Sequence, residues 1–134
     1  MDCTILIADN DQNWRDRLSG YFIEREFMVT SVENQDKACA VLKNFHFDIA
    51  IIEYCQNGRP ADKLCKAIRD KSSTTALILT CKHQTPEAEE KARLHSPAFY
   101  FVKPFNIEEL YAVVLRVLEI KYRKEQQFSH FAKV

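Results

Sequence analysis

The chain has 134 residues, of which 46% are hydrophobic. This apolar content is enough for one hydrophobic core, but the chain is too short for two domains. Nineteen basic and nineteen acidic residues cancel, and neither sign forms a long block, so the charge pattern indicates neither a nucleic-acid partner nor a membrane surface. No basic segment precedes the first apolar stretch and no segment is long enough to span a membrane, so we expect a cytoplasmic protein.

The first half of the chain alternates apolar runs with amphipathic stretches. Ile5–Ala8 is predicted as a buried strand, Phe27–Val32 as an edge strand with polar residues, and Phe47–Tyr54 as a strand buried on both faces. Asp11 and Asn34 are good N-cap residues for the two intervening helices. The apolar stripes of these helices are Trp14, Leu18, Tyr21 and Phe22 in the first, and Ala38, Val41, Leu42 and Phe45 in the second.

The second half continues the alternation. Asn57–Pro60 is a turn signal before a third helix, and Ala76–Leu79 and Ala98–Val102 are predicted strands. Thr85, followed by proline at the first helical position, opens a helix with a poor apolar stripe, which we expect to be weakly anchored and able to shift. Asn106, with Glu109, caps the last helix. The remaining apolar stripes are Ala61, Leu64, Cys65 and Ile68 in the third helix, and Leu110, Val113, Val114 and Val117 in the last.

Five strand–helix units result, and this order predicts an α/β fold: a doubly wound parallel sheet with right-handed crossovers and helices on both faces. The apolar stripe fades after about residue 121. We therefore expect one domain over residues 1–121 and an extension of the last helix, or a C-terminal tail, over 122–134.

Four of the five strands end in groups of complementary chemistry, and the carboxyl ends of parallel strands meet at one edge of the sheet. Asp9 and Asn10, Glu53, Thr80 and Lys103 are these groups. Acids and a backbone carbonyl suit Mg²⁺, while a hydroxyl and an ammonium suit phosphoryl oxygens. With only two glycines in the chain, a backbone cradle for a nucleotide is not expected, so side chains would grip any phosphate.

Several features occur in a specific order and spacing. They are Ile5–Asp11, Asp48–Glu53, Gly58 with Leu64, Leu79-Thr80, and Tyr100 three residues before Lys103-Pro104-Phe105. In these features the chain resembles a response-regulator receiver domain of two-component signalling, of the chemotaxis type, over nearly its whole length. The resemblance implies a flavodoxin-like, three-layer (βα)5 sandwich with strand order 2-1-3-4-5.

The resemblance also implies roles for the residues at the strand ends. Glu53 would occupy the phosphoacceptor position, and Lys103 would pair with the phosphoryl group and precede a proline whose peptide bond is usually cis. Thr80 would be the switch hydroxyl and Tyr100 the rotating aromatic side chain. The implied Mg²⁺ ligands are Asp9, Asn10, Glu53 and the backbone carbonyl of Cys55.

The chain departs from the family pattern at two of these positions. Glu53 replaces the acceptor aspartate, and its extra methylene displaces the attacking oxygen by on the order of 1 Å, which can lower a rate about 10²-fold. Asn10 replaces a second acid, so we expect weakened Mg²⁺ binding. We therefore expect ordinary phosphotransfer to be absent or very poor. Glu53 would act instead as a fixed partial mimic of the phosphorylated acceptor, paired with Lys103, which favours ionisation of both, and hydrogen-bonded by Thr80.

Three functions follow from these observations. The first is a non-enzymatic signalling module, a degenerate receiver that contacts a protein partner through residues 86–121; a sensor kinase or phosphotransfer protein fits, and a homodimer is left open. The second is a working phosphoacceptor that retains Mg²⁺. The third is a cysteine-dependent redox or metal sensor that uses Cys55 and Cys81, which flank the predicted pocket.

The number and spacing of the cysteines argue against structural roles for their thiols. The chain has five cysteines, an odd number, without CxxC spacing, which argues against a disulfide framework and a structural zinc site. Most are therefore expected to be reduced core residues.

Overall fold

The structure is a computed structural model that describes residues 3–56 and 58–133, with side chains described as far as residue 127. The chain divides into two compact units, one ending at Pro104 and the other beginning at Phe105.

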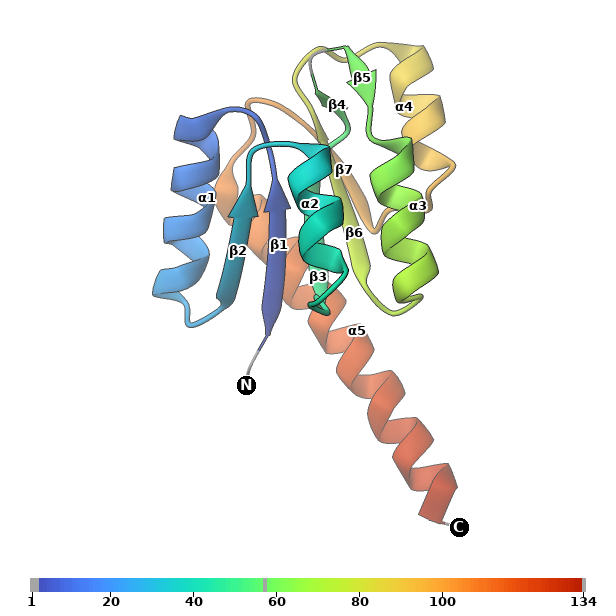
Figure 1. Ribbon diagram of the computed structural model, residues 1–134. Helices are drawn as coiled ribbons and strands as arrows, with labels where there is room; N and C mark the ends of the chain where they lie inside the picture. The colour runs from blue at the N-terminus through green and yellow to red at the C-terminus, as the bar shows by residue number, and fades with distance from the viewer. Residues whose placement is uncertain (1–2, 57, 134) are drawn as a thin grey trace. The chain divides into compact units, whose positions relative to one another are not determined.

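The first unit contains a parallel sheet of five strands in the order β2-β1-β3-β6-β7 (Figure 1). The strands are β1 (Thr4–Ala8), β2 (Met28–Val32), β3 (Ile49–Glu53), β6 (Ala76–Cys81) and β7 (Phe99–Val102). A separate two-stranded hairpin, β4 (Cys55–Gln56) with β5 (Arg59–Pro60), follows β3. Counted within the main sheet alone, the order is 2-1-3-4-5, which confirms the predicted doubly wound fold.

Side-chain caps begin three of the helices of this unit. The helices are α1 (Gln12–Glu24), α2 (Gln35–Leu42), α3 (Asp62–Lys71) and α4 (Pro86–Arg93). Asp11, Asn34 and Thr85 each accept a hydrogen bond from the backbone amide three residues later. These oxygens satisfy amides that have no partner inside the helix, so the caps read from the sequence are confirmed.

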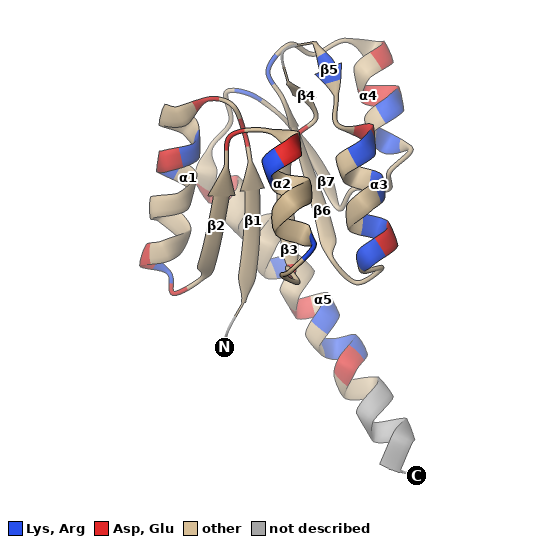
Figure 2. Cartoon of the chain, in the orientation of Figure 1, with Lys and Arg blue, Asp and Glu red and all other residues tan. Residues whose placement is uncertain are grey.

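The central strands β1, β3 and β6 are buried on both faces, because their successive side chains alternate between the two faces and both are covered. Leu6 and Ala8 of β1 belong to a core cluster that includes residues of α2, α3 and α4. Ile5 and Ile7, also fully buried, point to the opposite face, and α1 packs on β1 and β2. In Figure 2 the central strands are tan, and charged residues colour the helices and the loops that follow the strands.

The second unit consists mainly of α5 (Ile107–Lys133). Asn106 begins it by accepting a hydrogen bond from the amide of Glu108 at 2.9 Å. Leu110 and Val114 of the predicted stripe are buried. Helical structure continues past residue 121, while the predicted domain boundary there stays a prediction. Of the helices in the described residues, none is long and apolar enough to cross a membrane.

One local expectation differs from the structure, and another lies partly outside the described residues. Phe45, predicted on the inner face of the second helix, is 61% exposed, because α2 ends at Leu42 and the chain turns before Phe45. The predicted turn at 57–60 is part of the β4–β5 hairpin; its Asn57 lies outside the described residues, and Gly58 adopts φ 76°, which glycine tolerates best.

A pair of isoleucine truncations tests this assignment of the core. Ile52 of β3 is fully buried, so Ile52→Ala is expected to lower the free energy of unfolding by about 2–5 kcal/mol. Ile23 of α1 is 57% exposed, so Ile23→Ala is expected to change it by less than about 0.5 kcal/mol. Urea denaturation measures both; equal losses would contradict the assignment.

Candidate functional site

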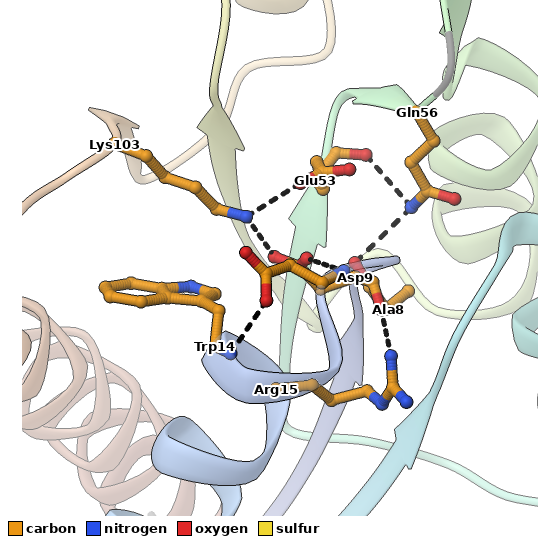
Figure 3. Close-up of polar contacts among 8 residues, drawn as sticks. Ala8, Asp9, Trp14, Arg15, Glu53, Gln56 and Lys103 are labelled. Carbon is orange, nitrogen blue, oxygen red and sulfur yellow. Dashed lines mark hydrogen bonds and ion pairs between the residues drawn. The ribbon is translucent and has the colours of Figure 1, made fainter.

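One lysine joins two buried carboxylates at the carboxyl edge of the sheet. Lys103 Nζ lies 2.6 Å from Asp9 Oδ2 and 2.7 Å from Glu53 Oε2 (Figure 3). The side chains are 8% exposed for the lysine and 3% exposed for each carboxylate. Asp9 follows β1, Glu53 ends β3 and Lys103 follows β7, so three strand ends meet as the sequence predicted. The Lys103–Pro104 peptide bond is cis.

The pKa values show that one cation serves two anions. Burial raises the pKa of Glu53, and the charge of Asp9 adds to the rise, while Lys103 counteracts it. Burial alone would lower the pKa of Lys103, but its hydrogen bonds to Asp9 and Glu53 raise it overall. As expected, the contact favours ionisation of both groups: Lys103 lowers the pKa of Glu53, and Glu53 raises that of Lys103. For Glu53 this effect is outweighed by burial, to which the charge of Asp9 adds, so its pKa is raised overall.

Further hydrogen bonds hold the chain around these carboxylates. Asp9 Oδ1 accepts from the amide of Asp11 at 2.9 Å, and Arg15 Nη1 donates to the carbonyl of Asp9 at 2.6 Å. The buried side chain of Gln56 donates to the carbonyls of Ala8 at 3.4 Å and Glu53 at 3.1 Å (Figure 3). The sequence analysis missed Gln56, and only its position just after the buried β3 strand could have indicated a role.

Thr80 lies beside this cluster without joining it. Its backbone is in register with Glu53 in the neighbouring strand, and the residue is fully buried. Among the described residues its hydroxyl oxygen has no hydrogen-bond partner. The expected hydrogen bond from Thr80 to Glu53 is therefore wrong: Glu53 Oε2 lies 2.7 Å from Lys103 Nζ, and the Thr80 hydroxyl does not bond to it.

Tyr100 is buried but bonded elsewhere. Its side chain is 8% exposed, and its hydroxyl donates to Gln84 Oε1 at 2.5 Å. Burial, with a contribution from the neighbouring Cys81, raises the pKa of this phenol. The sequence-predicted aromatic residue is thus in an inward position, held by a side chain of the β6–α4 loop.

The residues implied as Mg²⁺ ligands form an incomplete set. Both carboxylates already accept from Lys103, and the Asn10 side chain is exposed. Within residues 3–56 and 58–127 no group of three or more His, Cys, Asp or Glu side chains is arranged to hold a metal ion. A pocket of about 370 Å³ opens beside Glu53. Its lining residues are Asn10, Glu53, Cys55, Gly58, Lys82, His83, Thr85 and Ala88.

The cysteines near the site are poorly suited to thiolate chemistry. Burial raises the pKa of the Cys55 thiol, and Cys81 is fully buried. Because the thiolate is the reactive form, a raised pKa lowers reactivity at neutral pH. A thiol-based sensor therefore gains no support from this geometry.

The fold and this cluster define the class of protein. The family model for the response regulator receiver domain matches residues 5–115, so the chain belongs to the response regulator receiver domain family. Members of this family are typically non-enzymatic signalling modules of two-component systems, and they commonly bind Mg²⁺ at the phosphorylation site.

Individual relatives agree with this assignment. The chain is 30% identical over 128 residues to the transcriptional regulatory protein ResD of Bacillus subtilis, covering 95% of this chain and 51% of ResD. It therefore spans about half the length of that relative. A CheY-like receiver domain protein from Methanospirillum hungatei superposes with a TM-score of 0.86 at 16% identity, covering 92% of this chain and 99% of that one. The chemotaxis response regulator CheY4 of Vibrio cholerae superposes with a TM-score of 0.77 at 21% sequence identity, and the match covers 87% of this chain and 99% of that one.

Valine substitutions at Thr80 and Thr75 test whether the Thr80 hydroxyl makes a hydrogen bond. Thr80→Val removes a buried hydroxyl that makes no hydrogen bond, so it is expected to raise the free energy of unfolding by on the order of 1 kcal/mol. Thr75 is also buried, but its hydroxyl donates to the carbonyl of Phe47 at 2.7 Å, so Thr75→Val should cost about 1–3 kcal/mol. Thermal and urea unfolding measure both. Destabilisation by Thr80→Val equal to that of Thr75→Val would show that Thr80 has a partner.

The raised pKa of Glu53 predicts a pH dependence of stability. A carboxyl whose pKa is higher in the folded state binds its proton more tightly there, so folding becomes more favourable as pH falls. In a chelator-containing buffer, the natural chain should gain stability relative to Glu53→Gln from neutral pH down to the ordinary carboxyl value of 4.5. Urea unfolding across this range measures the difference. A relative loss on acidification would mean that Lys103 stabilises the ionised carboxylate more than burial opposes it.

Proposed function

We propose that this receiver domain is not phosphorylated in the usual way, and that Glu53 acts as a fixed partial mimic of the phosphorylated acceptor. The observation that carries the proposal is the contact of Lys103 with Glu53 at 2.7 Å. A lysine that would otherwise pair with a phosphoryl group already has a carboxylate partner, which the chain itself supplies. The signal is then passed on by protein–protein contact through residues 86–121.

The mimic is partial for two reasons. A carboxylate carries one charge and two oxygens, whereas a phosphoryl group carries nearly two charges and three oxygens. Only the Lys103 contact is made, because the Thr80 hydroxyl does not reach Glu53. The mimic therefore reproduces the ion pair between Lys103 and a negative group at position 53, but it does not reproduce the hydrogen bond from the Thr80 hydroxyl.

Phosphotransfer to Glu53 is disfavoured by both charge and position. Its raised pKa lowers the fraction of the ionised nucleophile, and its oxygen is held by the ammonium of Lys103. Weak Mg²⁺ binding follows from the neutral Asn10 and from the sharing of one lysine between Asp9 and Glu53. A sensor kinase or phosphotransfer protein is therefore proposed as a docking partner rather than as a phosphate donor to this site.

Incubation with a small phosphodonor tests the proposal. The natural chain, given acetyl phosphate or phosphoramidate with Mg²⁺, is expected to gain no phosphoryl group by intact mass spectrometry. Glu53→Asp shortens the side chain by one methylene, and together with Asn10→Asp it restores the acidic pair, so this double variant should become phosphorylated. Asn10→Asp alone is the matched control and should not.

The contrary outcome supports the other function within the family. The pocket beside Glu53 leaves room for a small donor to approach. A phosphoryl group on the natural chain, dependent on Mg²⁺ and lost in Glu53→Gln, would establish a working phosphoacceptor and overturn the mimic.

A further inference from the structure

Helix α4 has little apolar packing to hold it in place. Ala92 is its one buried residue, whereas α1, α2 and α3 each bury two or three side chains, most of them larger. Removing one alanine methyl from water contributes about 0.8 kcal/mol. Polar contacts must therefore hold α4 against β7.

A closed chain of side-chain contacts, the Tyr100 clamp, connects β7 to both ends of α4. The Tyr100 hydroxyl donates to Gln84 Oε1 at 2.5 Å, and Gln84 Nε2 donates to Glu89 Oε1 at 2.7 Å. Glu89 Oε2 accepts from Arg93 Nε at 3.1 Å, and the Arg93 guanidinium lies 5.8 Å from the centre of the Tyr100 ring. The four residues keep the phenol buried and the helix beside it.

A second set of contacts, the Tyr54 clamp, holds the segment that follows α4. The hydroxyl of the fully buried Tyr54 donates to Asp62 Oδ1 at 2.5 Å, and His95 Nε2 lies 2.6 Å from the same oxygen. Because a carboxylate only accepts, this ring nitrogen carries a proton and donates. Arg69 adds bonds to the carbonyls of His95 at 3.4 Å and Ser96 at 3.2 Å. The end of α4 is thereby fixed to α3 and to the end of β3.

Apart from Tyr100, the two clamps contain none of the side chains of the candidate site. Lys103 and Glu53 bond to each other and to Asp9, and the Thr80 hydroxyl makes no hydrogen bond among the described residues. We propose that the two clamps, rather than a contact from Glu53 through Thr80, hold α4 in place and keep Tyr100 buried. The arrangement of α4 and β7 that the chain presents to a partner is then constant and does not depend on the state of the site. This inference goes beyond the proposed function and does not depend on it.

Removal of the two tyrosine hydroxyls is the most specific test of the clamps. Both are buried, whereas the Glu89–Arg93 ion pair is substantially exposed and contributes less. Tyr54→Phe and Tyr100→Phe remove only the hydroxyl and leave the ring packing in place, so the fold is expected to survive. Tyr122→Phe, at a tyrosine 58% exposed on α5, is the matched control.

Amide hydrogen exchange of the full chain, followed by mass spectrometry, reports the local opening of α4. Each of Tyr54→Phe and Tyr100→Phe is expected to speed exchange over residues 86–95 about five-fold, the factor that one lost hydrogen bond of about 1 kcal/mol produces. Exchange in β1 and β3 should remain slower than exchange over residues 86–95; equal rates in these segments would indicate global unfolding instead of local opening of α4. Gln84→Met removes the acceptor instead of the donor and should reproduce the Tyr100→Phe result.

Variants at the site decide between the clamps and a signal from Glu53. Glu53→Gln and Thr80→Val are expected to leave exchange over residues 86–95 within two-fold of the natural chain, as is Tyr122→Phe. The proposal is overturned if the clamp variants leave α4 unchanged, or if Glu53→Gln accelerates its exchange as much as they do. Phosphorylation of the natural chain would overturn the proposed function alone, because these exchange rates are measured without a phosphodonor.

Discussion

The structure depends on one ammonium group that serves two buried carboxylates. Without Lys103, Asp9 and Glu53 would face each other as like charges in an interior that water barely reaches, and breaking a buried pair in this way is costly. The lysine also ties the end of β7 to the ends of β1 and β3, which are not its neighbours in the sheet. The same contact thus closes the site and joins three strands.

Sharing this cation has consequences for chemistry. Burial, with the charge of Asp9, raises the pKa of Glu53 although Lys103 counteracts the rise, so fewer Glu53 carboxyl groups are ionised at a given pH. The Glu53 carboxylate bonds to Lys103, while in the described part of the chain the Thr80 hydroxyl makes no hydrogen bond. A site that is already internally paired has less to gain from Mg²⁺ or phosphate, which is the physical basis of the proposed degenerate receiver.

The inward position of Tyr100 has a separate cause. Its hydroxyl is bonded by Gln84, and the far end of α4 is held through His95 and Asp62. Helix α4 has one buried residue, Ala92, and is positioned by hydrogen bonds and one ion pair. These contacts are directional, and a single substitution can remove any one of them. The site and helix α4 therefore belong to two different polar networks, and the properties of one need not report the state of the other.

Local patterns in the sequence determined the elements of this protein, their order in the sheet through the family resemblance, and the meeting of Asp9, Glu53 and Lys103 at one edge. These follow from periodicity, N-cap residues and the parallel arrangement of strands, which are encoded within short stretches. Only the tertiary structure decided that the Thr80 hydroxyl has no hydrogen-bond partner among the described residues, that Gln56 and His95 take part in buried or half-buried networks, and that Glu53 is harder to ionise. Each of these depends on which donor reaches which acceptor across distant segments, and on how deeply both are buried, which spacing along the chain does not specify.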